Sequence, residues 1–128
     1  MNAKIANLLT KIGTPYKMFF KDGNYCGCFY PVYEVFEKLP KYPLPADNPE
    51  INFSYGMDKI AQCCEAVEKD YLQVGDIVAA WFRNELHVAL YTGSGKIIHV
   101  FKDHDLRINR LEALKKIHGY YRVKEEWR

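Results

Sequence analysis

The chain has 128 residues, of which 48% are hydrophobic and 27% are charged, and this composition predicts one globular domain spanning residues 1–128. The formal net charge is only +2 and the basic residues are scattered, so the sequence predicts neither a nucleic-acid-binding surface nor a membrane-binding one. No apolar run approaches the roughly 18 residues that cross a bilayer, and the N-terminal stretch does not resemble a signal peptide. We therefore expect a protein that is cytoplasmic as synthesised, with its four cysteines reduced.

The first half of the chain predicts helices. Apolar residues recur at helical spacing over residues 2–12, and Gly13 ends that pattern. A second helix is predicted over residues 28–39. Residues 40–56 contain four prolines and predict a long surface loop, after which a third, weaker helix is predicted over residues 57–69.

The second half predicts strands, because runs of β-branched and aromatic residues replace the helical pattern. The sequence "TGSG" predicts a tight turn between two of these strands, and a short helix is expected over residues 111–117. Helices followed by an antiparallel sheet of about five strands indicate the α+β class. The predicted strands cover residues 77–82, 86–92, 96–101, about 106–109, and 120–124.

Two histidines, one on each strand, lie in the hairpin predicted around the "TGSG" turn. Side chains alternate along a strand, so His87 and Ala89 share one face. A three-residue loop at residues 93–95 places Ala89 opposite His99 and makes His87 its diagonal neighbour, roughly 7–8 Å away at the backbone. A register change of one residue separates the two rings onto opposite faces, so the predicted histidine pair depends on the turn.

Cysteines lie at the predicted start of the second helix. Cys26 and Cys28 flank Gly27 there, and a helix N-terminus lowers the pKa of a thiol because its N–H groups stabilise the thiolate. A neighbouring imidazole can take the thiol proton, and a third polar group can orient that imidazole. Cys28, His87 and His99 offer these three roles in that order.

The cysteine spacing does not indicate a metal site. The chain has one C-x-C and one C-C pair, whereas zinc ligands are commonly two to four residues apart, and C-G-C is not the C-x-x-C redox motif. We expect neither a metal nor another cofactor. Cys63 and Cys64 are predicted to be one buried and one half-exposed residue of an amphipathic helix.

Motifs over nearly the whole chain resemble the NlpC family of papain-like cysteine peptidases, which cleave peptidoglycan stem peptides. In chain order, "IGTPY" resembles the opening G-x-P-Y, "CFYPVYEVF" the nucleophile helix, and "LQVGDIV" the entry to the sheet. The hairpin "HVALYTGSGKIIHV" is the most specific match, to H-V-G-I-Y-x-G-x-G-x-x-I-H-A. The ending "GYYR" resembles the version of the family found in phage tail proteins.

The resemblance implies a papain-like fold, with N-terminal helices packed on a central antiparallel sheet. It also implies that Cys28 is the nucleophile, His87 the base and His99 the orienting residue. Tyr16 would lie beside the oxyanion site, where its hydroxyl aids the tetrahedral intermediate.

Cys26 is the alternative nucleophile. The family usually has D-C at this position, and no aspartate precedes either cysteine here. Cys26 fits the family pattern C-x-G-[FL] at its third following residue, Phe29. The helix phase favours Cys28, as does Pro31, because proline is tolerated only in the first turn of a helix.

The resulting functional hypothesis is a thiol-dependent amide hydrolase that works through an acyl-enzyme. The expected substrate is a peptidoglycan stem peptide or another peptide, and phage tail proteins are the expected partners of a virion-associated enzyme. The alternatives are an inactive tail or assembly component with the same fold, and a papain-like amidase or acyltransferase with another substrate.

Overall fold

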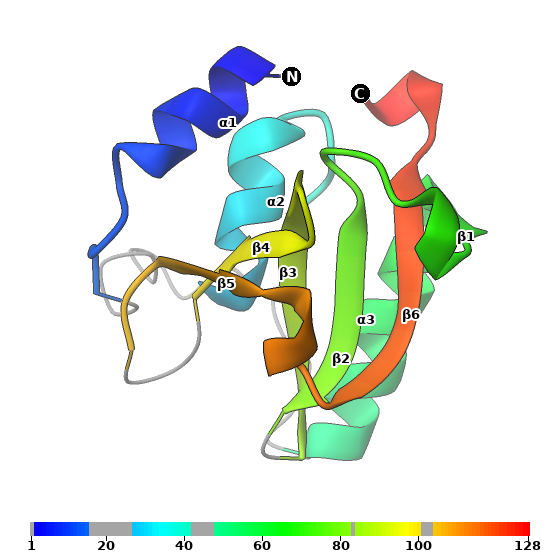
Figure 1. Cartoon of the computed structure of the whole chain (residues 1–128). Helices are drawn as coiled ribbons and strands as arrows, with labels where there is room; N and C mark the ends of the chain where they lie inside the picture. The colour runs from blue at the N-terminus through cyan, green and yellow to red at the C-terminus, as the bar shows by residue number, and fades with distance from the viewer. Residues whose placement is uncertain (1, 16–26, 42–47, 83, 101–103) are drawn as a thin grey trace.

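The computed structural model describes residues 2–15, 27–41, 48–82, 84–100 and 104–128. Its helices come mainly from the first half of the chain and its strands from the second half (Figure 1). The α-helices are α1 (Asn2–Leu9), α2 (Tyr30–Val35) and α3 (Pro49–Cys63). The strands are β1 (Cys64–Val67), β2 (Ile77–Phe82), β3 (Glu85–Gly93), β4 (Lys96–His99), β5 (Arg107–Arg110) and β6 (Lys116–Val123). Single 3-10 turns are η2 (Gly27–Phe29), η3 (Lys69–Tyr71), η4 (Leu111–Ala113) and η5 (Glu125–Trp127).

The six strands of the described residues form one antiparallel sheet in the order β1-β6-β2-β3-β4-β5. The α-helices pack on one face of this sheet (Figure 1). The predicted α+β architecture is therefore confirmed, with one strand more than expected. None of the described helices has the length and apolar character needed to cross a membrane.

Both faces of the sheet are covered. One, which we call the helix-side core, packs α1, α2 and α3 against strand residues such as Leu86 and Val88. The other, which we call the far-side core, is smaller and has six buried members: Val78, Ala80, Ala89, Ile97, Leu111 and Leu114. Successive residues of β3 therefore enter different cores, because strand side chains alternate between faces.

The helix α2 is shorter than the predicted helix 28–39. It is preceded by the 3-10 turn η2, and Pro31 lies in its first turn, where a proline costs no intrahelical hydrogen bond. It ends at Val35, although Phe36 and Leu39 remain buried. Pro40 accounts for part of this shortening, since the residue before a proline avoids the helical region.

The prediction of a loop over residues 40–56 is wrong from Pro49 onward. The helix α3 begins at Pro49, and the side chain of Asn48 caps it by accepting hydrogen bonds from the N–H groups of Glu50 and Ile51. Proline is a favoured first helical residue, so Asn-Pro-Glu is a helix start rather than a loop signal. Gly56 lets this helix approach the sheet closely, because a Cβ there would lie 2.3 Å from Cδ2 of Leu86.

The predicted helix 57–69 is also wrong at its C-terminal end. The chain leaves α3 after Cys63, and Cys64 opens strand β1 by pairing with Val123 of β6. The expected helix 111–117 is only the turn η4, and β6 begins at Lys116. In both places pairing between distant strands overrides the local pattern.

The hairpin that carries the two histidines has a different turn from the predicted one. Gly93 pairs with Lys96, which leaves a two-residue loop, and a bulge follows between Tyr91 and Gly93. Ser94 and Gly95 have φ angles of 54° and 72°, as a tight hairpin turn requires. The bulge restores the expected register, because Leu90 pairs with Ile98 and the next position along places Ala89 opposite His99.

Candidate active site

The side chains of His87 and His99 contact each other on the face of the sheet that carries the far-side core. Nε2 of His87 is 2.8 Å from Nδ1 of His99, and the two side chains are almost fully buried. His87 of β3 pairs with Ala80 of β2, which belongs to the far-side core, whereas the preceding residue Leu86 belongs to the helix-side core. The His87 ring therefore lies on the far side of the sheet. The predicted placement of both rings on one face is confirmed, while their catalytic role stays a prediction.

A third polar side chain, absent from the sequence-based prediction, extends this pair. Oδ1 of Asn109 lies 2.8 Å from Nε2 of His99. Asn109 belongs to β5, which pairs with β4 so that His99 faces Arg107 and Ile97 faces Asn109. The sequence predicts a strand here but not its register with β4, so no signal pointed to this asparagine.

The contact between Asn109 and His99 indicates which ring nitrogens carry protons. An amide oxygen only accepts, so the N–H of His99 is on Nε2 and its Nδ1 accepts a hydrogen bond. His87 therefore donates from its own Nε2 to Nδ1 of His99. In a neutral ring this leaves the lone pair of His87 on Nδ1, which is the form of a general base.

Burial keeps both rings neutral near pH 7. It lowers the pKa of His87 from 6.5 to about 3, with a smaller contribution from the neighbouring His99. Burial also lowers the pKa of His99. The hydrogen bond to Asn109 raises this pKa in part, and the positive charge of Arg107 lowers it further. His87 can therefore accept a proton readily only when a negative charge forms beside it, such as a thiolate.

We expect the buried histidines to make the fold acid-sensitive. Their folded-state pKa values lie below 6.5, so the unfolded chain binds protons that the folded rings do not. Stability therefore falls as the pH drops below about 6.5, and this loss continues until the pH nears the folded-state pKa of His87. Between pH 7 and pH 5, His87 alone should lower the free energy of unfolding by about 2 kcal/mol.

Urea unfolding at pH 7, 6 and 5 measures this effect. The variant His87→Gln should show a flatter pH dependence, because the substituted side chain does not titrate. The matched control His118→Gln removes an exposed histidine and should keep the wild-type slope. Equal slopes in all three proteins would contradict the assigned origin of the acid sensitivity.

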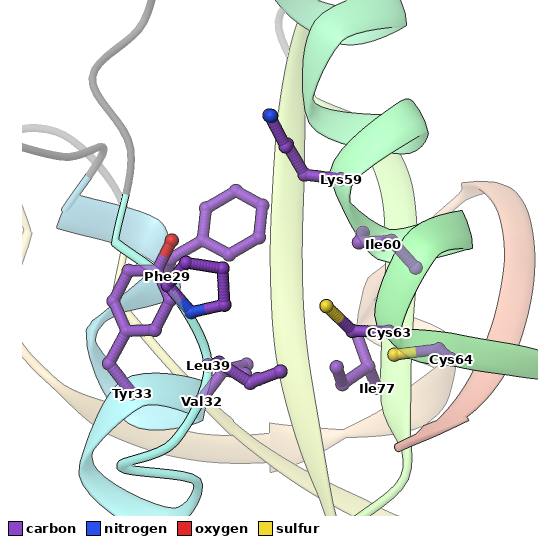
Figure 2. A pocket seen from close by; sticks show the side chains of 10 residues that line it. Phe29, Val32, Tyr33, Leu39, Lys59, Ile60, Cys63, Cys64 and Ile77 are labelled. Atoms are coloured by element: carbon purple, nitrogen blue, oxygen red, sulfur yellow. The ribbon is translucent and has the colours of Figure 1, made fainter. Parts of the chain in front are cut away.

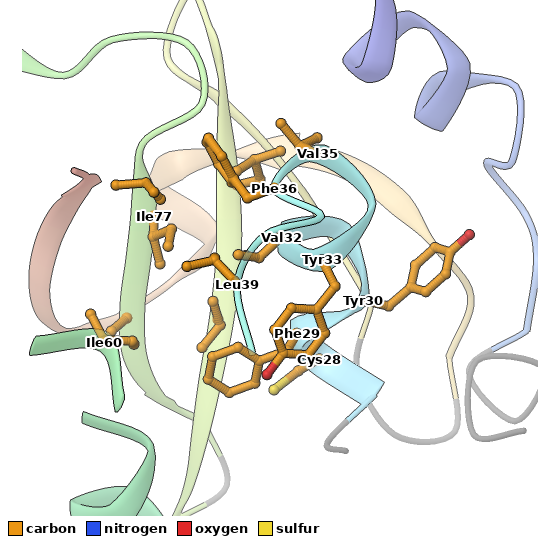
Figure 3. Packing of buried hydrophobic residues seen from close by; sticks show 14 of the residues in the cluster. Cys28, Phe29, Tyr30, Val32, Tyr33, Val35, Phe36, Leu39, Ile60 and Ile77 are labelled. Carbon is orange, nitrogen blue, oxygen red and sulfur yellow. The ribbon is translucent and has the colours of Figure 1, made fainter. Parts of the chain in front are cut away.

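Cys28 of η2 lies in the helix-side core and contacts β3 near the start of that strand. Its thiol donates a weak hydrogen bond to the carbonyl of Leu86, with 3.8 Å between Sγ and the oxygen, and the side chain is 4% exposed. Figure 3 shows it in η2, directly before α2, near Phe29 and Tyr33. Leu86 directly precedes His87 in β3, so the thiol contacts the residue before this histidine, but the helix-side core and the His87 ring lie on opposite faces of β3.

The turn η2, which precedes α2, nevertheless lies at the part of β3 that carries His87. Strand β4 pairs with the half of β3 that runs from Leu90 to Gly93. The other half, from Glu85 to Ala89, carries His87 and pairs with β2, and we call it the near half. The contact between Cys28 and Leu86 places η2 at this near half. The alternative nucleophile Cys26 and the predicted oxyanion residue Tyr16 lie outside the described residues.

Cys63 and Cys64 do not have the surroundings of reactive thiols. Both are buried, which corrects the expectation that one is half-exposed. They line an apolar pocket with residues such as Ile60 of α3 and Phe29 of η2 (Figure 2). Burial raises the pKa of the Cys63 thiol, and it raises the pKa of Cys64 to about 12, so neither is a thiolate at neutral pH. The described residues contain no group of three or more side chains suited to holding a metal ion.

Comparison with solved structures identifies the fold. Neither a protein-family model nor a curated protein matches the chain. Among solved structures 18 chains match, including an NlpC/P60 family protein from Bacillus cereus ATCC 10987. That protein is 21% identical with a TM-score of 0.50, and the match covers 84% of this chain and 37% of that chain. The chain therefore has an NlpC/P60-type fold, as predicted, and corresponds to well under half of that protein.

Proposed function

We propose that this NlpC/P60-type domain is a thiol-dependent hydrolase of peptide amide bonds. One observation carries the proposal: a chain of hydrogen bonds runs from the half-buried Asn109 through His99 to the buried His87, at the part of β3 that the turn η2 contacts. A cysteine at that turn and a neutral, oriented imidazole are the two parts that thiol catalysis needs.

The proposed reaction has two steps. In the first, Nδ1 of His87 takes the thiol proton, the sulfur attacks the amide carbonyl carbon, and the proton passes to the leaving amine, which leaves a thioester. In the second, His87 takes a proton from water, the hydroxide attacks the thioester, and the proton returns to the sulfur as the acid leaves. His99 orients the imidazole, and the Tyr16 hydroxyl with backbone N–H groups at the helix start stabilises the oxyanion.

The nucleophile comes from the segment Cys26–Gly27–Cys28. The helix phase favours Cys28, but its thiol lies in the helix-side core and donates to the carbonyl of Leu86, while His87 presents its ring to the other face. These surroundings suit a structural thiol better than an attacking one. They support the alternative, Cys26, as the nucleophile.

Peptidoglycan stem peptide is the proposed substrate class. It rests on the resemblance of the hairpin and helix motifs and on a fold shared with an NlpC/P60 family protein. The phage-tail motif "GYYR" supports a virion-associated enzyme that meets the cell wall with tail proteins as partners. On this proposal the chain is made in the host cytoplasm and acts outside it.

Digestion of purified stem peptides and of whole peptidoglycan, read by mass spectrometry, tests the proposed function. We expect a new amine and a new carboxylate at one peptide bond, and we expect prior treatment with iodoacetamide to abolish both. Intact substrate after incubation with folded protein would contradict the proposal. It would favour the alternative of a tail or assembly component that keeps the fold without turnover.

A further inference from the structure

We propose that Asn109 is a positioning residue that sets the proton positions on both histidines. This inference rests on the proposed function for its catalytic consequence, but its structural part concerns the rings alone. Asn109 would hold His99 with its N–H on Nε2, and His99 in turn would hold His87 in the form that can accept a thiol proton.

The sheet register brings the asparagine to the ring. Ile97 pairs with Asn109 and His99 pairs with Arg107, so Asn109 is the diagonal neighbour of His99 on the adjacent strand. Both side chains point to the far side of the sheet, where Ile97 is part of the core. The 2.8 Å contact between Oδ1 and Nε2 is therefore a product of strand pairing rather than of a loop.

The chemistry of the amide gives the contact a direction. Its oxygen cannot donate, so the contact selects the Nε2–H form of His99, and the 2.8 Å contact between the rings passes the same selection to His87. In the opposite form, His87 carries its proton on Nδ1 and cannot take one from a thiol there. Burial makes the selection effective, because His99 is 1% exposed and water has little access to replace the amide.

Two variants separate this role from a structural one. Asn109→Leu keeps the approximate volume and removes the acceptor, whereas Asn109→Asp keeps an acceptor oxygen in the same place. Arg110→Leu is the matched control, because Arg110 is the next residue of the same strand, exposed and on the opposite face. Urea unfolding of all four proteins identifies any loss that comes from stability alone.

The direct readout is nitrogen NMR of the imidazole rings, with the four histidine signals assigned from His→Gln variants. We expect Nε2–H in both His87 and His99 of the wild type, of Asn109→Asp and of the control. In Asn109→Leu we expect both rings to lose this preference, together with a fall in kcat/KM of about 10- to 100-fold. Asn109→Asp should retain most of the activity.

Wild-type proton positions on both rings of folded Asn109→Leu would overturn the inference. The inference also fails if Asn109→Asp loses its proton positions and activity to the same extent as the leucine variant. If the wild type hydrolyses no peptide but the rings respond as expected, the positioning role stands and only the proposed function fails.

Discussion

The variant His87→Gln is expected to lower kcat/KM for peptide hydrolysis by about 10³-fold, because glutamine cannot accept the thiol proton. The side-chain amide of the glutamine can still donate a hydrogen bond to Nδ1 of His99. The variant therefore removes the base but leaves His99 with hydrogen-bond partners on both ring nitrogens. The loss should therefore lie mainly in kcat, since a base acts in the transition state rather than in substrate binding.

Steady-state kinetics on a stem-peptide substrate measures this effect, with urea unfolding at pH 7 to verify that the variant is folded. His118→Gln serves as the control, because His118 is exposed and its ring lies roughly perpendicular to that of Phe53, a residue of the helix-side core rather than of the histidine pair. The control should retain wild-type kinetics. Hydrolysis by His87→Gln within a few-fold of the wild type would show that another group is the base.

The second large effect concerns the two cysteines at the helix start. Cys26→Ala should abolish hydrolysis, whereas Cys28→Ala should retain most of it and lower the free energy of unfolding by about 1 kcal/mol through lost packing. The difference follows from the position of Cys28, which is 4% exposed in the helix-side core and whose thiol is hydrogen-bonded to the Leu86 carbonyl.

The pair of alanine variants is its own matched control, because the two changes are identical and two residues apart. Activity is followed with the same stem peptide, and stability by urea unfolding. Loss of activity in folded Cys28→Ala, with retention in Cys26→Ala, would reverse the assignment and restore the nucleophile that the helix phase favours. Activity in both variants would exclude the whole segment as the source of the nucleophile.

The histidine pair could be predicted from the sequence because two local signals agree there. Alternation along β3 fixes which residues share a face, and the glycines around Ser94 fix the turn. The predicted turn length was wrong, but the predicted register was correct, because a two-residue loop with one bulge gives the same strand register as a three-residue loop. The first two helices and the α+β order followed from periodicity in the same way.

Contacts between distant strands could not be predicted. Asn109 reaches His99 through the register of β5 against β4, and nothing in the local pattern around either residue sets it. Cys64 similarly leaves its helix to pair with Val123, almost sixty residues further along the chain. At Pro49 the helix signal is present in the sequence, but a run of prolines does not by itself distinguish one that starts a helix from those that prevent it.

Brief alkylation with iodoacetamide at mildly acidic pH, followed by peptide mapping of the wild type and of His87→Gln, tests the proposed thiol and base together. We predict that one thiol of the Cys26–Cys28 segment, Cys26, reacts well before Cys63 and Cys64, whose pKa values are raised. We also predict that this selectivity is lost in His87→Gln, because His87 no longer takes the thiol proton. Slow labelling of all four cysteines at similar rates, or fast labelling that is unchanged in His87→Gln, would contradict a thiol activated by this histidine.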